Sequence, residues 1–151
     1  MIGHSMGGFM AASAAARDPE VAGLVMISAW NIGATMSGPR ETHRVDSFPA
    51  ASSRLPGTTP AELQVEAEAN AANWNYLDYA EALKTRPVFI VESHDRNLSY
   101  NKAIKEALQK AGNSRVKEVY IETDHSYSDR RIALQVAGLQ WLETVIAPAA
   151  K

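Results

Sequence analysis

The residues Gly3-His4-Ser5-Met6-Gly7 stand two residues from the first residue of the chain and fit the pattern Gly-x-Ser-x-Gly. This pattern is typical of a nucleophile elbow, a sharp turn between a β-strand and an α-helix that exposes a serine hydroxyl. Glycine is needed in such a turn where backbone and helix come so close that a β-carbon would clash. The following residues, up to Ala16, are mostly strong helix formers, and Asp18-Pro19 ends the run. The pattern therefore predicts a turn that presents Ser5, followed by a helix.

Composition limits the classes of function open to the chain. Its 151 residues are enough for one domain with a hydrophobic core, and 46% hydrophobic and 21% charged residues are ordinary for a globular protein. A net charge of −2 gives no reason to expect nucleic acid or an anionic membrane as a partner. No apolar run approaches the ~20 residues of a membrane span. The chain has no cysteine, and its histidines and carboxylates lack metal-ligand spacing, so we expect no metal and no cofactor. The compartment is not indicated, and the cytoplasm is only the default.

The rest of the chain predicts alternating strands and helices. Near-continuous apolar runs at 21–30 and 87–91 are typical of strands covered on both faces, and 116–121 alternates as an edge strand does. Helical spacing of apolar residues predicts helices at 101–111 and 132–146, with Asp129 at the start of the second and Pro148 after its end. We therefore expect an α/β fold with a mostly parallel sheet of about three strands, plus a stub at Met1-Ile2.

Residues 31–85 interrupt this rhythm and predict an insertion into a core formed by 1–30 and 86–151. Residues 31–59 are loop-like, whereas Pro60 to Leu83 is expected to be helical. An insertion of this length in a compact domain is often functional. Its aromatic residues favour a helical cap over a substrate pocket, although they also fit a role in packing the insertion itself. As substrate-binding residues we expect Trp30, Trp74 and Tyr76.

Two polar residues at strand ends are candidates for activating Ser5. A serine hydroxyl needs a base, and the base needs a third group that orients it. Asp95 follows the strand at 87–91 and His125 follows the strand at 116–121, in the chain order Ser, Asp, His. Both therefore belong at the edge of the sheet where open α/β folds bind ligands. Asp124 and Glu92 remain as alternative acids, whereas His4, His43 and His94 are expected to have no catalytic role.

With these residues in place, the chain resembles the C-terminal half of an α/β-hydrolase, in the branch of prolyl oligopeptidase and dienelactone hydrolase. The segments RPVFIVESHDRN and TDHSYSDRRIALQVAGLQWL carry the resemblance together with the elbow, most strongly over 1–30 and 86–146. The resemblance implies that Ser5 is the nucleophile, His125 the base and Asp95 the acid. It also implies hydrolysis of an ester, thioester or peptide through an acyl-enzyme.

The family's oxyanion hole requires two backbone N–H groups. Met6 is expected to supply one, but the early strand whose loop supplies the other is not in this sequence. We therefore expect a truncated fold with an open sheet edge next to the elbow, which favours a homo-oligomer formed through that edge. Three origins stay open, namely a fragment of a longer hydrolase, a dimer that pairs its edges, and a minimal hydrolase with a replacement donor in Asn31–Gly38.

Three functions remain open on these grounds. The first is a serine hydrolase that cleaves small carboxylic esters with Ser5, His125 and Asp95. The second is a non-catalytic fragment or interaction module of a longer hydrolase. The third is a serine peptidase of prolyl-oligopeptidase type, which is less favoured because no charged anchor for a peptide terminus can be assigned.

Overall fold

The computed structural model describes residues 1–38 and 56–146. The chain divides into two compact units, one formed by 1–30 together with 77–151 and the other by 31–76. The second unit ends at Tyr76, whereas the insertion expected from the sequence extends to residue 85. We describe each unit separately.

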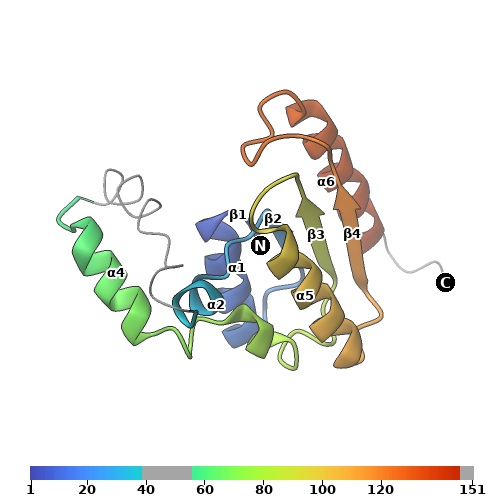
Figure 1. Ribbon diagram of the computed structural model, residues 1–151. Coiled ribbons are helices and arrows are strands. Elements are labelled where there is room, and N and C mark those ends of the chain that lie inside the picture. Colours follow the sequence, from blue (N-terminus) through green and yellow to red (C-terminus); the bar gives the residue numbers. More distant parts are fainter. Residues whose placement is uncertain (39–55, 147–151) are drawn as a thin grey trace. The chain divides into compact units, whose positions relative to one another are not determined.

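The first unit is built on a four-stranded parallel sheet with the order β1-β2-β3-β4 (Figure 1). The strands are β1 (Ile2–His4), β2 (Leu24–Ile27), β3 (Val88–Glu92) and β4 (Val116–Tyr120). The sequence predicted only a stub before the elbow, but β1 forms a short strand that pairs with β2 from Ile2 opposite Val25 to His4 opposite Ile27. The expected α/β class with a mostly parallel sheet is confirmed, with four strands instead of about three.

Three helices flank this sheet, namely α1 (Met6–Arg17), α5 (Leu98–Lys110) and α6 (Arg131–Ile146). Helix α6 covers one face, where Trp141 stacks on Phe89 of β3 with ring centroids 5.6 Å apart. Helix α5 packs on the opposite face of β3 and β4 and buries Ile104 and Leu108 (Figure 1). Pro148 lies outside the described residues. Within the described ranges, no helix combines the length and apolar character needed to cross a membrane.

The second unit contains α2 (Ile32–Met36) and α4 (Pro60–Ala69), and the 3-10 helix Tyr76–Tyr79 begins at its end. A capping box between Thr59 and Glu62 starts α4. The predicted helix from 60 to 83 is wrong beyond residue 69. Asn70 is the C-terminal cap of α4; its side-chain amide donates to the carbonyl of Glu66, and turns follow. Part of the loop-like stretch is also helical, in α2, while residues 39–55, which include His43, lie outside the described residues.

Candidate active site

The elbow is a strained turn between β1 and α1. Ser5 has φ 55° and ψ −120°, a positive φ that residues other than glycine rarely adopt. Its backbone is held on both sides, because its N–H donates to the carbonyl of Ile27 at 2.9 Å and its carbonyl accepts from the N–H groups of Gly8 and Trp30, each at 3.0 Å. Such a conformation costs on the order of 1–3 kcal/mol and persists only where the surroundings enforce it.

Two glycines explain how this turn closes. A β-carbon on Gly3 would lie 1.9 Å from the carbonyl oxygen of Gly7, and one on Gly8 would lie 2.6 Å from the β-carbon of Ala29. Gly7 differs from the expectation for the motif, because a β-carbon there would meet no atom of the described residues within 4 Å. The close approaches are therefore those of Gly3 to the first turn of α1 and of Gly8 to the chain after β2.

Asp95 and His125 meet at the ends of β3 and β4. The Nδ1 atom of His125 lies 2.8 Å from Oδ2 of Asp95, and the Asp95 side chain is 6% exposed whereas that of His125 is 32% exposed. The alternative acid Asp124 is engaged in its own loop, where its Oδ1 accepts from the backbone N–H groups of Ser126 and Ser128. The geometry thus pairs His125 with Asp95 among the carboxylates considered.

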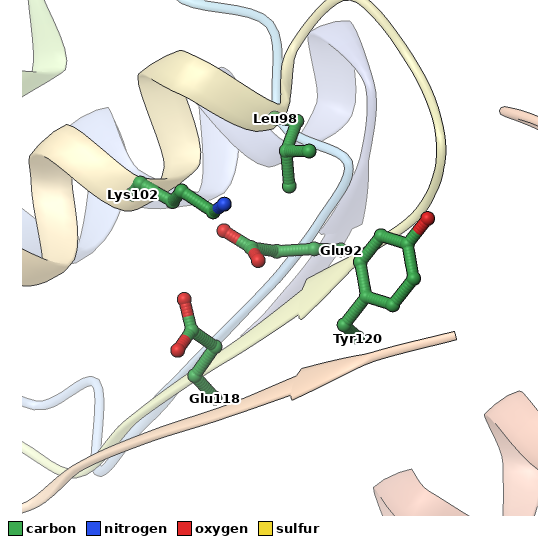
Figure 2. Close-up of a pocket in the computed structure, with 5 residues that line it drawn as sticks. All are labelled: Glu92, Leu98, Lys102, Glu118 and Tyr120. Atoms are coloured by element: carbon green, nitrogen blue, oxygen red, sulfur yellow. The ribbon is translucent and has the colours of Figure 1, made fainter. Parts of the chain in front are cut away.

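The other alternative acid, Glu92, faces away into a separate hollow on the α5 side of the sheet. Figure 2 shows its carboxyl group between Lys102 of α5 and Glu118 of β4, in an open hollow of about 400 Å³ that Leu98 and Tyr120 also line. Glu92 is 2% exposed, and its Oε1 has no hydrogen-bond partner among the described residues. Burial, followed by the nearby charge of Glu118, raises the pKa of Glu92 to about 7 against the opposing effect of Lys102.

A chain of three buried hydroxyls supports Asp95. Ser93 Oγ donates to Oδ2 of Asp95 at 2.9 Å, Ser28 Oγ lies 2.9 Å from Ser93 Oγ, and Tyr127 OH lies 2.9 Å from Ser28 Oγ. A carboxylate only accepts, and each hydroxyl has one proton to donate. The direction of the chain therefore follows, with Tyr127 donating to Ser28, Ser28 to Ser93 and Ser93 to Asp95.

These contacts keep Asp95 ionised. Burial alone would raise its pKa, but the hydrogen bond with His125, the Ser28–Ser93 hydroxyl chain that ends on its carboxylate, and the backbone N–H of Asn97 together outweigh burial and hold the pKa at about 2. The Asn97 N–H donates to Oδ1 at 2.7 Å, and the Asn97 side-chain amide donates to the carbonyl of Ser28 at 2.9 Å. A carboxylate in this setting can orient a histidine ring and stabilise its protonated form.

Backbone strain is concentrated at this site. Ser5, Ser28 and Tyr127 are the three non-glycine residues with positive φ in the described part of the chain, at 55°, 42° and 55°. One forms the elbow, and the other two are hydrogen-bonded to each other in the hydroxyl chain beside Asp95. Clustering of such residues is typical of functional sites, so this observation supports a site built from the three loops.

His4, for which no catalytic role was expected, lies against His125. Its Nε2 is 2.7 Å from the carbonyl oxygen of His125, and the two ring centroids are 4.7 Å apart. In the described part of the chain, the hydrogen bonds of His125 run to Asp95 and His4, and neither involves the Ser5 hydroxyl. Catalytic hydrogen bonds are often long in ligand-free enzymes, so the roles of Ser5, Asp95 and His125 stay predictions.

The remaining predicted site residues are placed as follows. Met6 is the first residue of α1, where backbone N–H groups have no partner within the helix, as an oxyanion donor requires. The proposed replacement segment Asn31–Gly38 lies in the other unit, where Gly33 N–H already donates to the carbonyl of Trp74. Trp30 is largely buried, Trp74 is half-buried and Tyr76 is fully buried. Their part in substrate binding stays a prediction.

The remaining chemistry-bearing side chains add little to this site. His94 is exposed, and its backbone N–H donates to the carbonyl of Thr123 at 3.2 Å. Over 1–38 and 56–146, no three His, Asp or Glu side chains gather in a way that would hold a metal ion. The chemistry available here is therefore that of a hydroxyl, an imidazole and a carboxylate.

Comparison with known proteins defines the fold. No family model matches the sequence, and no curated protein sequence matches it. Solved structures do match, and the chain has the α/β-hydrolase-like fold of several hydrolases. It superimposes on the esterase Pf2001 of Pyrococcus furiosus with a TM-score of 0.64 and 14% identity, covering 97% of this chain and 53% of that one. For 2,6-dihydroxy-pseudo-oxynicotine hydrolase the TM-score is 0.60 at 19% identity, covering 97% and 40%.

A third match extends the comparison. E-2-(acetamidomethylene)succinate hydrolase gives a TM-score of 0.51 at 16% identity, covering 97% of this chain and 66% of that one. The chain thus spans about half the length of the first structures that it matches. At these identities the likeness establishes the fold alone, in agreement with the truncated α/β-hydrolase fold expected from the sequence.

Proposed function

We propose that the chain is a serine hydrolase that cleaves small carboxylic esters through an acyl-enzyme formed on Ser5. The observation that carries the proposal is the Asp95–His125 hydrogen bond at the strand ends, beside a strained elbow that presents Ser5. The named activities of the matched structures, an esterase and hydrolases, agree with this class of reaction.

In the proposed mechanism, His125 takes the proton of the Ser5 hydroxyl as the oxygen attacks the substrate carbonyl. Asp95 fixes the ring through Nδ1 and stabilises the imidazolium that forms, while it stays ionised itself. The N–H of Met6 at the start of α1 stabilises the oxyanion, helped by the positive end of the helix. The leaving alcohol receives the proton from His125, and water then repeats the sequence to release the acid.

Labelling with a fluorophosphonate, which reacts with activated serines, tests the proposal directly. The wild-type chain should be labelled at Ser5, and Ser5→Ala should abolish labelling because the attacking oxygen is gone. Asp95→Asn should slow labelling by roughly 10⁴-fold, since loss of the orienting carboxylate leaves the ring in the wrong tautomer. Intact-mass spectrometry measures the adduct, and Ser99→Ala, at an exposed serine of α5, serves as the control that keeps full labelling.

The alternatives predict different results in the same experiment. A folded wild-type chain that is not labelled would favour the non-catalytic fragment or interaction module. Labelling combined with cleavage of peptides but not of small esters would favour a peptidase of prolyl-oligopeptidase type. Circular dichroism on the same samples separates loss of reactivity from loss of folding.

A further inference from the structure

The contact between His4 and His125 links the two loops that must work together in the proposed reaction. His4 ends β1 and directly precedes Ser5, whereas His125 lies in the loop after β4, at the opposite end of the sheet order. The hydrogen bond from His4 therefore joins the elbow to the base loop across the full width of the sheet.

The hydrogen bond also defines the protonation of the His4 ring. Its partner is the backbone carbonyl of His125, which only accepts, so Nε2 of His4 is the atom that carries the proton. The His4 ring also lies 4.7 Å from the His125 ring and meets Tyr127 edge-on at 6.3 Å. His4 is thus held by one hydrogen bond that it donates and by two ring contacts, all of them with residues of the loop that carries His125.

His4 is suited to this place because it is uncharged near neutral pH. His4 is an exposed residue, but partial desolvation of its ring, and to a smaller extent the nearby His125, lower its pKa, while the bond to the His125 carbonyl and Asp95 oppose this effect. A cation at this position would repel the imidazolium that His125 must become in the proposed reaction. A neutral ring that donates one hydrogen bond avoids that cost.

We propose that His4 is a positioning residue, which fixes the loop of His125 relative to the Ser5 elbow by donating a hydrogen bond to the His125 carbonyl. Asp95 orients the ring of His125 from one side and His4 holds its backbone from the other. His4 itself transfers no proton to or from Ser5 in this assignment, because its Nε2–H is committed to the carbonyl. The proposal rests on the proposed function of Ser5 and His125.

Three substitutions separate the donor from the ring. His4→Phe keeps an aromatic ring and loses the donor, His4→Gln keeps an N–H at the place of Nε2, and His4→Ala loses both. A net hydrogen bond contributes about 1 kcal/mol, so His4→Phe and His4→Ala should slow fluorophosphonate labelling of Ser5 by about fivefold. His4→Gln should recover the rate to within about threefold of wild type.

A second measurement does not depend on reactivity. The proton between His125 Nδ1 and Asp95 should give a low-field NMR signal in the full chain, identified by its absence in His125→Asn. It should broaden or vanish in His4→Phe and return in His4→Gln.

Two results would overturn the role of His4. The first is unchanged labelling and an unchanged NMR signal in His4→Phe, and the second is a His4→Gln variant that is as impaired as His4→Phe. In either case, labelling of Ser5 in the wild type would still support the proposed function. Conversely, the NMR signal could change with the His4 substitutions as expected although the wild-type chain is never labelled. That result would support positioning by His4 and reject the proposed function.

Discussion

Glu92 and Asp95 are close in sequence, yet their surroundings move the pKa of the two carboxyls in opposite directions. Around Glu92, burial and the neighbouring Glu118 raise the pKa to about 7. Around Asp95, burial acts in the same sense, but hydrogen bonds from His125 and from the hydroxyls beside it bring the pKa to about 2. The two carboxyls differ in their neighbours, because several donors reach Asp95, whereas Glu92 faces a second carboxyl and its Oε1 has no hydrogen-bond partner among the described residues.

The raised pKa of Glu92 predicts a pH-dependent stability. Between about pH 4.5 and 7 the folded chain keeps a proton on Glu92 that the unfolded chain releases, so stability falls as pH rises through this window. The shift corresponds to about 3 kcal/mol in the free energy of unfolding, lost in full above pH 7. Glu92→Gln copies the neutral acid and should match the wild type near pH 4 but exceed its stability by up to that amount at pH 8.

Urea unfolding followed by circular dichroism at both pH values measures this difference. The exposed Glu20 provides a matched control, because Glu20→Gln should leave the difference between the two pH values as in the wild type. Equal stability of Glu92→Gln and wild type at pH 8 would show that Glu92 ionises there without cost.

At the scale of elements, the strands and the site loops were more predictable than the insertion. Both-face burial makes a strand a continuous apolar run, which is why β2 falls within its predicted range and β3 exceeds its predicted range by one residue, Glu92. The ends of parallel strands share one edge, which predicted that Asp95 and His125 would be neighbours. The helix predicted to residue 83 ended at 69, because capping at Asn70 depends on a local bond that spacing does not reveal.

The contacts of His4 and the hydroxyl chain had no sequence signal. Ser28, Ser93 and Tyr127 are single polar residues on three loops, and neither their spacing nor their type marks them as partners. Their contact arises only when strands β2, β3 and β4 are placed side by side. Likewise, the proximity of His4 to His125 depends on how the loop after β4 folds back over the sheet edge.

Adjacent glycines in α1 give a matched test of how closely this helix approaches the chain after β2. Gly8→Ala places a β-carbon 2.6 Å from that of Ala29 and should destabilise the fold by about 1–3 kcal/mol through overpacking. Gly7→Ala meets nothing within 4 Å and should stabilise by about 0.5–1 kcal/mol, because alanine favours the helix. Urea midpoints of the two variants decide the matter, and equal midpoints would contradict the close approach.

At the scale of the whole molecule, we propose that two copies of the chain associate through the free edge of β1. In the described part of the chain, β1 pairs with β2 alone, and Ile2 is 58% exposed on that edge. An apolar hollow of about 320 Å³ adjoins it, lined in part by Met1, Ile2, Trp141, Leu142, Val145 and Ile146. An open edge with apolar side chains favours pairing with another strand.

Ile2→Lys should disrupt this association, because a charged side chain on an edge strand opposes pairing. Light scattering coupled to size-exclusion chromatography should give a dimer or larger species for the wild type and a monomer for Ile2→Lys. Ile132→Lys is the control, since Ile132 is 77% exposed on α6 and lies away from the strand edge in sequence and element. A monomeric wild type, or an oligomer that persists in Ile2→Lys, would rule out the edge as the interface.

The one-way chain from Tyr127 through Ser28 and Ser93 has a consequence for how Asp95 responds to its medium. Its carboxylate is hydrogen-bonded to the His125 ring, the Ser93 hydroxyl and the backbone N–H of Asn97, and no lysine or arginine is among its hydrogen-bond partners in the described ranges. Dissolved ions weaken attraction between exposed charges but reach buried dipoles poorly. We therefore expect the pKa of Asp95 to change little with salt concentration, so that Asp95 stays ionised beside His125 in both concentrated salt and dilute buffer.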